Sequence, residues 1–159
     1  MAILLLGVRI RIRTFFLRQL VFLYTMMTKE EKYNYWLDTA EYDLNTAEAM
    51  YKTGRWLYVV FMCQQSIEKI VKGLYILYLD DYFPRIHDIN NLIKRFENKL
   101  PQPISEEEKM FFARLSAFYL NNRYPEYKSK LSSQTKKSEA LEILNKTKEV
   151  FKWLKTLKP

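Results

Sequence analysis

WLYVVFMCQQSIEKIVKGLYILYL, residues 56–79, determines how this 159-residue chain folds. Apolar or weakly polar side chains recur in it at alternating steps of four and three, which places them on one stripe of a helix. This stripe consists of Trp56, Val60, Cys63, Ile67, Ile70, Leu74 and Leu77. A helix that is apolar around most of its circumference has to be covered by other helices. We therefore expect the rest of the chain to pack around residues 56–79.

The composition favours a helical protein without disulfides. Glycine occurs 3 times and proline 5 times, and few segments show the alternation of strands. The single cysteine, Cys63, excludes an internal disulfide, and with one histidine it cannot build a Cys/His zinc site. Cys63 lies on the apolar stripe and is expected in the core. A lone thiol is compatible with the cytoplasm, where we expect the protein. We expect no metal and no cofactor.

Half of the net charge of +8 lies in the first 27 residues, which carry four arginines and no acid. Net charge alone therefore does not indicate nucleic-acid binding by the remaining chain. The apolar runs of residues 1–27 are shorter than the roughly 18–20 residues that span a membrane. We interpret residues 1–27 as a leader or an extra N-terminal segment, with a membrane-surface helix as the alternative. Residues 28–159 form the predicted domain.

Local signals place four further helices. Thr28-Lys-Glu-Glu31 is a capping box that opens a helix over 29–53, with its acidic residues mostly on outer faces, and Gly54 ends it. The short connection predicts an antiparallel hairpin with residues 56–79. After Pro84, Asp88 caps a short helix that ends before Pro101. A second capping box at residues 105–108 opens a helix that ends at residues 121–122. Residues 126–137 are expected to be a mobile connection, and 138–157 the last helix. The predicted fold is an all-α, up-and-down bundle of four to five helices.

Five residues are candidates for contact with a ligand. His87 either orients a turn or acts as a base or phosphate contact. Arg123 and Tyr124 suit phosphate pairing and stacking, or alternatively end a helix. Lys69 and Lys72 share a narrow polar stripe with Glu68 and Gln65, which either faces a partner or ligand or is a solvated face.

Four motifs occur in a fixed order over about residues 30–155. They are Trp36-Leu-x-x-Ala40-x-x-Asp43-Leu44-x-x-Ala47, Gln64-Gln65-x-x-Glu68-Lys69-x-x-Lys72, His87-Asp88-Ile89 and Arg123-Tyr124-Pro125. In this ordered set the sequence resembles the HEPN domain family. The resemblance implies a homodimeric helical bundle that binds a nucleotide or RNA. It also implies a minimal nucleotidyltransferase as partner, in some cases within a toxin–antitoxin system.

The same resemblance bears on catalysis. Metal-independent RNase activity in this family is tied to an arginine followed four to six residues later by a histidine. Arg123 is followed by no histidine, and Arg85 lies only two residues before His87. The missing motif argues against RNase activity, so a binding module is the leading hypothesis. The alternatives are an RNase with a divergent site and a protein-interaction scaffold.

Overall fold

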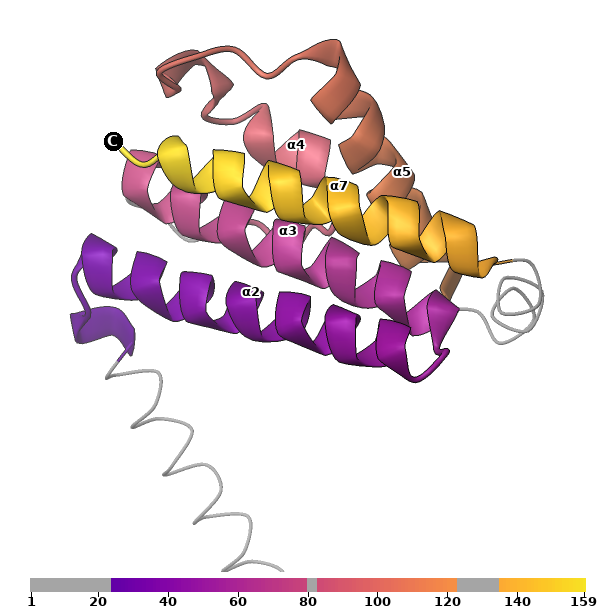
Figure 1. Ribbon diagram of the computed structural model, residues 1–159. Helices are drawn as coiled ribbons and strands as arrows, with labels where there is room; N and C mark the ends of the chain where they lie inside the picture. Colours follow the sequence, from indigo (N-terminus) through magenta and orange to yellow (C-terminus); the bar gives the residue numbers. More distant parts are fainter. Residues whose placement is uncertain (1–23, 80–82, 123–134) are drawn as a thin grey trace, which may run out of the picture.

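The computed structural model describes residues 24–79, 83–122 and 135–159, and within these ranges the chain is all-helical (Figure 1). The helices are α2 (Lys29–Lys52), α3 (Trp56–Leu79), α4 (Ile89–Ile93), the 3₁₀ helix η1 (Glu97–Lys99), α5 (Glu106–Asn122) and α7 (Lys137–Thr156). Successive long helices run in alternating directions, which confirms the predicted up-and-down bundle. No helix in the described ranges is long and apolar enough to cross a membrane.

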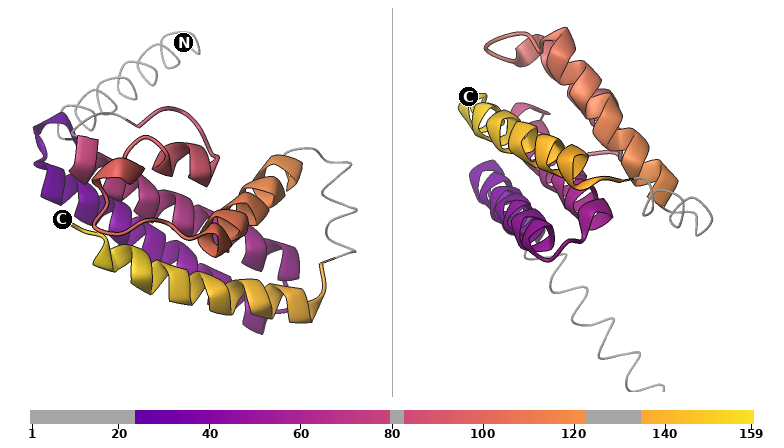
Figure 2. Two further views of the ribbon diagram at one scale, coloured as in Figure 1. Left: turned by 90° about the horizontal axis from the view of Figure 1, so that it is seen from above. Right: turned by 45° about the vertical axis from the view of Figure 1, so that its right-hand side comes forward.

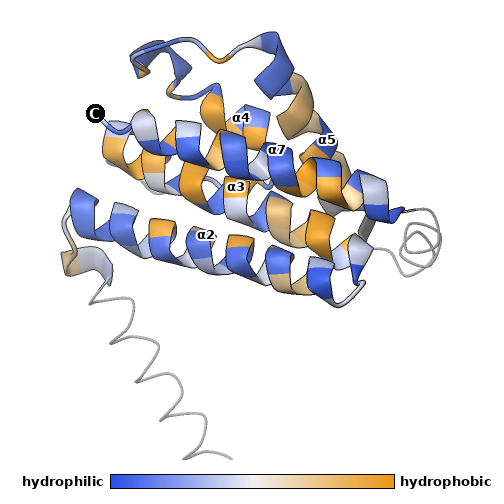
Figure 3. Cartoon of the chain, viewed as in Figure 1, coloured by the Kyte–Doolittle hydropathy of each residue, from blue (hydrophilic) through white to orange (hydrophobic). Residues whose placement is uncertain are grey.

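Helix α3 is the centre of the bundle, as its apolar sequence predicts. It packs against α2, α7, α5 and α4, and Figure 2 shows these helices arranged around it. Most of its side chains between Leu57 and Ile76 are buried, and Cys63 is fully so, which confirms its predicted place in the core. Figure 3 shows the resulting contrast between apolar α3 and the hydrophilic outer surface of α2.

The α2–α3 hairpin forms through the predicted local signals. The Glu31 N–H donates to Thr28 Oγ1, and the Thr28 N–H donates back to the Glu31 carboxylate at 2.7 Å. Gly54 adopts a positive φ of 75° in the turn, a conformation that glycine adopts without strain. At Gly73 a Cβ atom would lie 3.1 Å from the ring of Tyr33. The absence of a side chain at residue 73 therefore lets α2 approach α3 closely.

The third predicted helix is shorter than expected. Helix α4 ends at Ile93, and the chain reaches Pro101 through a turn and η1 instead of a continued helix. Phe96 leaves the helical conformation, with φ −132° and ψ 5°, and its ring stacks on Tyr78 of α3 at 5.6 Å. Burial of this ring outweighs the few hydrogen bonds that one more helical turn would add.

Candidate functional site

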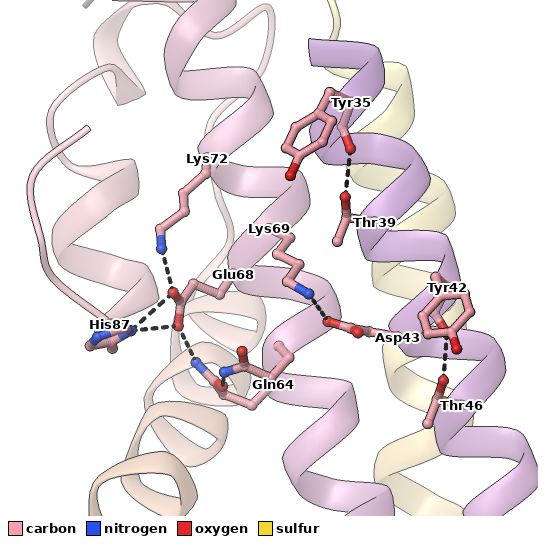
Figure 4. A network of polar contacts seen from close by, with 11 residues as sticks. Tyr35, Thr39, Tyr42, Asp43, Thr46, Gln64, Glu68, Lys69, Lys72 and His87 are labelled. Carbon is pink, nitrogen blue, oxygen red and sulfur yellow. Dashed lines mark hydrogen bonds and ion pairs between the residues drawn. The ribbon is translucent and has the colours of Figure 1, made fainter. Parts of the chain in front are cut away.

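Glu68 lies at the centre of a buried polar cluster on α3, which we call the Glu68 cluster (Figure 4). Only 3% of Glu68 is exposed, and its carboxylate accepts hydrogen bonds from Gln64 Nε2 and Lys72 Nζ, each at 2.6 Å. His87 Nδ1 lies 3.0 Å from the same carboxylate. Gln64 and Lys72 stand one turn before and after Glu68, so the helix itself brings them together. Only His87 comes from a distant part of the chain.

The turn before α4 positions His87. The Ile86 N–H donates to the Pro84 carbonyl at 2.8 Å, which closes a three-residue turn. Asp88 caps α4 by accepting the Asn91 N–H at 3.0 Å. The Ile89 N–H donates to Ser116 Oγ of α5, so the start of α4 is fixed to the bundle. The His87 side chain is thereby held against Glu68 and remains 35% exposed.

Two aromatic rings cover the ammonium group of Lys72. Its Nζ atom lies 4.8 Å from the centre of the Phe83 ring and 5.6 Å from that of Trp36. The two rings meet edge to face at 5.0 Å. Trp36 is also tied to the segment before α2, because its Nε1–H donates to the Tyr24 hydroxyl at 3.0 Å. Ring faces attract a cation and replace part of the water that burial removes, so the two rings stabilise the Lys72 ammonium group beside Glu68.

A second ion pair joins α2 to α3 near the Glu68 cluster. Lys69 Nζ lies 2.5 Å from Asp43 Oδ2, and Asp43 is only 8% exposed. The expectation that the acids of the first helix face outward is wrong for Asp43, because Lys69 stabilises this carboxylate inside the α2–α3 contact. Tyr35 and Tyr42, both exposed, lie on α2 near this pair (Figure 4).

The five candidate residues fall into three groups. Lys72 and His87 meet at Glu68, whereas Lys69 contacts Asp43 instead. Arg123 and Tyr124, like most of the predicted connection over 126–137, lie outside the described residues. The solvated-face alternative is wrong for Glu68 and Lys72, which are buried. Direct contact of any of the five with a ligand stays a prediction.

Sequence reasoning missed Gln64 as a member of the cluster. Gln64 is fully buried, donates to Glu68 and accepts a hydrogen bond from Gln65 Nε2 at 2.6 Å. A signal was present, because Gln64, Glu68 and Lys72 are spaced by four on a helix that is otherwise apolar along that side. Polar side chains at such positions are stable only when they satisfy one another.

The arrangement limits the chemistry available to the described residues. A carboxylate on Nδ1 fixes the orientation and tautomer of an imidazole, leaving Nε2 as the ring nitrogen that Glu68 does not contact. Burial raises the pKa of the Cys63 thiol to about 12, so it is not a thiolate nucleophile. In the described ranges no three His, Cys, Asp or Glu side chains gather as a metal site.

Comparisons with known proteins agree with this architecture. A family model described as HEPN domain matches residues 33–157. The crystal structure of TT1696 from Thermus thermophilus is similar, with a TM-score of 0.64 and 21% sequence identity over 79% of this chain and 97% of that chain. At that identity the likeness concerns the fold alone. No curated protein sequence matches the chain.

Proposed function

The chain belongs to the HEPN family, and on this basis we propose that it binds a nucleotide or RNA and acts with a minimal nucleotidyltransferase. Membership of the family supports a nucleotide- or RNA-related function in general. The finer proposal is a cytoplasmic homodimer that works in a toxin–antitoxin system. The observation that carries the proposed binding of a nucleotide or RNA is the Glu68 cluster, which holds the partly exposed His87 in one orientation.

The proposed binding group is the His87 imidazole. Glu68 engages Nδ1, so the ring has little rotational freedom to lose when a ligand binds. Lys72 neutralises Glu68 at 2.6 Å, and a phosphate approaching His87 therefore does not meet an uncompensated carboxylate. In this proposal Lys72 and Lys69 support the site electrostatically, and Arg123 and Tyr124 provide phosphate pairing and base stacking.

Binding of a labelled single-stranded RNA to the full chain in the presence of a chelator tests the proposal. We expect His87→Ala to weaken binding about 5- to 10-fold, the loss of one hydrogen bond worth roughly 1–1.5 kcal/mol. The matched control is Asn145→Ala, which removes an exposed polar side chain from α7 and should leave the affinity unchanged. Arg123→Ala in the same assay tests the predicted phosphate contact.

Two results would contradict the proposal in different ways. If the wild-type protein binds neither nucleotide nor RNA, with or without a nucleotidyltransferase, the binding function is wrong and a protein-interaction scaffold is favoured. If RNA binds and His87→Ala behaves like Asn145→Ala, the function stands but the site lies elsewhere. Circular dichroism of each variant establishes that the comparison is made between folded proteins.

One observation favours a second candidate, a metal-independent RNase with a divergent site. The His87–Glu68 contact of 3.0 Å has the geometry by which a carboxylate orients a histidine for general acid–base catalysis. In that scheme Arg123 would stabilise the charged phosphorane. The same RNA assay decides between the two, because cleavage that survives the chelator and disappears in His87→Ala requires the enzyme. Binding without cleavage favours the binding module.

A further inference from the structure

We propose that a basic hollow beside α4 binds backbone phosphates of the RNA strand, as a subsite separate from the Glu68 cluster. The inference rests on the proposed function, because it names how a polynucleotide is held. The hollow has a volume of about 460 Å³ and is lined by Ile86, Asn91, Lys94 and Arg95. Lys94 is the C-cap residue of α4 and Arg95 follows it, and both side chains are exposed.

The charges of this hollow are uncompensated within the described part of the chain. Neither Lys94 nor Arg95 has a carboxylate partner there, and the same holds for exposed Arg85 in the preceding turn. A second hollow, of about 440 Å³, lies between α2 and α7 and also contains lysines. Two of its three lysines, Lys148 and Lys155, are paired with acids of α2 at 2.7 and 2.8 Å, and these two acids line the hollow themselves. The hollow beside α4 is therefore the better anion site.

The charged and amide groups of the lining suit a phosphate better than a base. A guanidinium group presents a fork of donors that matches two phosphate oxygens, and an ammonium group adds a point charge. Asn91 contributes an amide that can donate as well. Among the described residues no aromatic ring lines the hollow. These residues therefore offer no ring on which a base could stack.

The position of the hollow points to a strand rather than to a single free anion. Ile86 lines it, and the next residue, His87, contacts Glu68. Consecutive residues are about 3.8 Å apart at Cα. The hollow beside α4 and the Glu68 cluster therefore adjoin the same turn. An RNA strand crossing this turn would place one phosphate near Lys94 and Arg95 and a neighbouring nucleotide near His87.

The experiment compares two double variants that each remove one lysine and one arginine charge. Lys94→Gln/Arg95→Gln empties the proposed subsite of charge. Lys52→Gln/Arg55→Gln is the matched control, since these exposed residues flank the turn at the start of α3. The subsite lies towards the C-terminal end of α3, because Phe96, which follows Arg95, stacks on Tyr78 near that end. Affinity for a labelled single-stranded RNA is measured by fluorescence anisotropy over a range of salt concentrations.

We expect the subsite variant to bind RNA roughly 10- to 30-fold more weakly at about 0.1 M salt, with a salt slope lower by about 1.4, as loss of two single-strand phosphate contacts predicts. The control should stay within about threefold of wild type. Equal behaviour of the two variants, with RNA binding by the wild type intact, overturns the subsite and leaves the proposed function standing. Absence of RNA binding by the wild type overturns the subsite, and the proposed function falls with it only if no nucleotide binds either. Inorganic tripolyphosphate that binds as tightly as RNA overturns the assignment to a strand.

Discussion

The Glu68 cluster and the ion pairs between α2 and α7 use the same chemical groups in opposite environments. Glu68 and Lys72 are 2.6 Å apart, and Glu48 and Lys148 are 2.7 Å apart. The Glu68 side chain is 4% exposed, whereas both side chains of the second pair are 38% exposed. Contact distance alone therefore does not indicate how much an ion pair contributes to the free energy of unfolding. Burial determines how much stability is lost when one charge is left without its partner.

Each region has a different consequence for the fold. The surface pairs join α2 to α7 without removing either charge from water, so they adjust stability by small amounts. In the Glu68 cluster each polar group depends on the others, since Gln64 and Lys72 are buried with Glu68. Such a cluster specifies one arrangement of α3 and the turn at His87. Removing one of its members lowers the free energy of unfolding strongly, because the others stay buried without a partner.

The largest difference is expected when one acid is removed from each region. Glu68→Ala should lower the free energy of unfolding by about 3–5 kcal/mol, because it leaves the Lys72 charge and the Gln64 amide buried without their partner. Glu48→Ala should lower it by no more than about 1 kcal/mol. Urea-induced unfolding followed by circular dichroism measures both. Equal losses would show that the Glu68 cluster is hydrated in solution.

A smaller effect is expected when the buried pair is replaced as a unit. In Glu68→Gln/Lys72→Met no charge stays behind, so the free energy of unfolding should return to within about 1 kcal/mol of wild type. Lys72→Met alone leaves the Glu68 carboxylate without its cation and should be the less stable protein. The same unfolding experiment checks the order, and a double variant less stable than Lys72→Met would contradict it.

Salt should produce the smallest effect and distinguish the regions most directly. At about 1 M salt the screening length falls to about 3 Å, which weakens exposed pairs more than buried ones. The coupling energy of Glu48 with Lys148, about 0.5 kcal/mol in a double-mutant cycle at low salt, should fall towards zero. The coupling of Glu68 with Lys72 should persist. A loss of both couplings at high salt would contradict the burial argument.

Sequence patterns predicted those parts of the fold that depend on neighbouring residues. The capping box at Thr28, the left-handed Gly54 and the apolar periodicity of α3 act locally, and the boundaries they predict agree with α2 and α3. The end of α4 was not predictable in this way. It depends on the contact of Phe96 with Tyr78, which only the packed structure brings together.

The candidate site shows the same division. The spacing of Glu68 and Lys72 predicted that they share a side of α3, but Lys72 is covered by Trp36 and Phe83, which belong to other segments. The contact of His87 with Glu68 likewise joins residues 19 positions apart. No periodicity relates position 87 to position 68. The sequence therefore could not decide whether the polar stripe of α3 is a solvated face or faces a partner or ligand.

Cys63 has a practical consequence for the measurements above. It is the only cysteine of the chain, it is fully buried on α3, and its pKa of about 12 keeps it protonated at neutral pH. A thiol reagent therefore reacts only with molecules in which α3 has become exposed to solvent. The rate of modification reports how often the bundle opens, so the protein carries an intrinsic probe of its own opening and needs no introduced label.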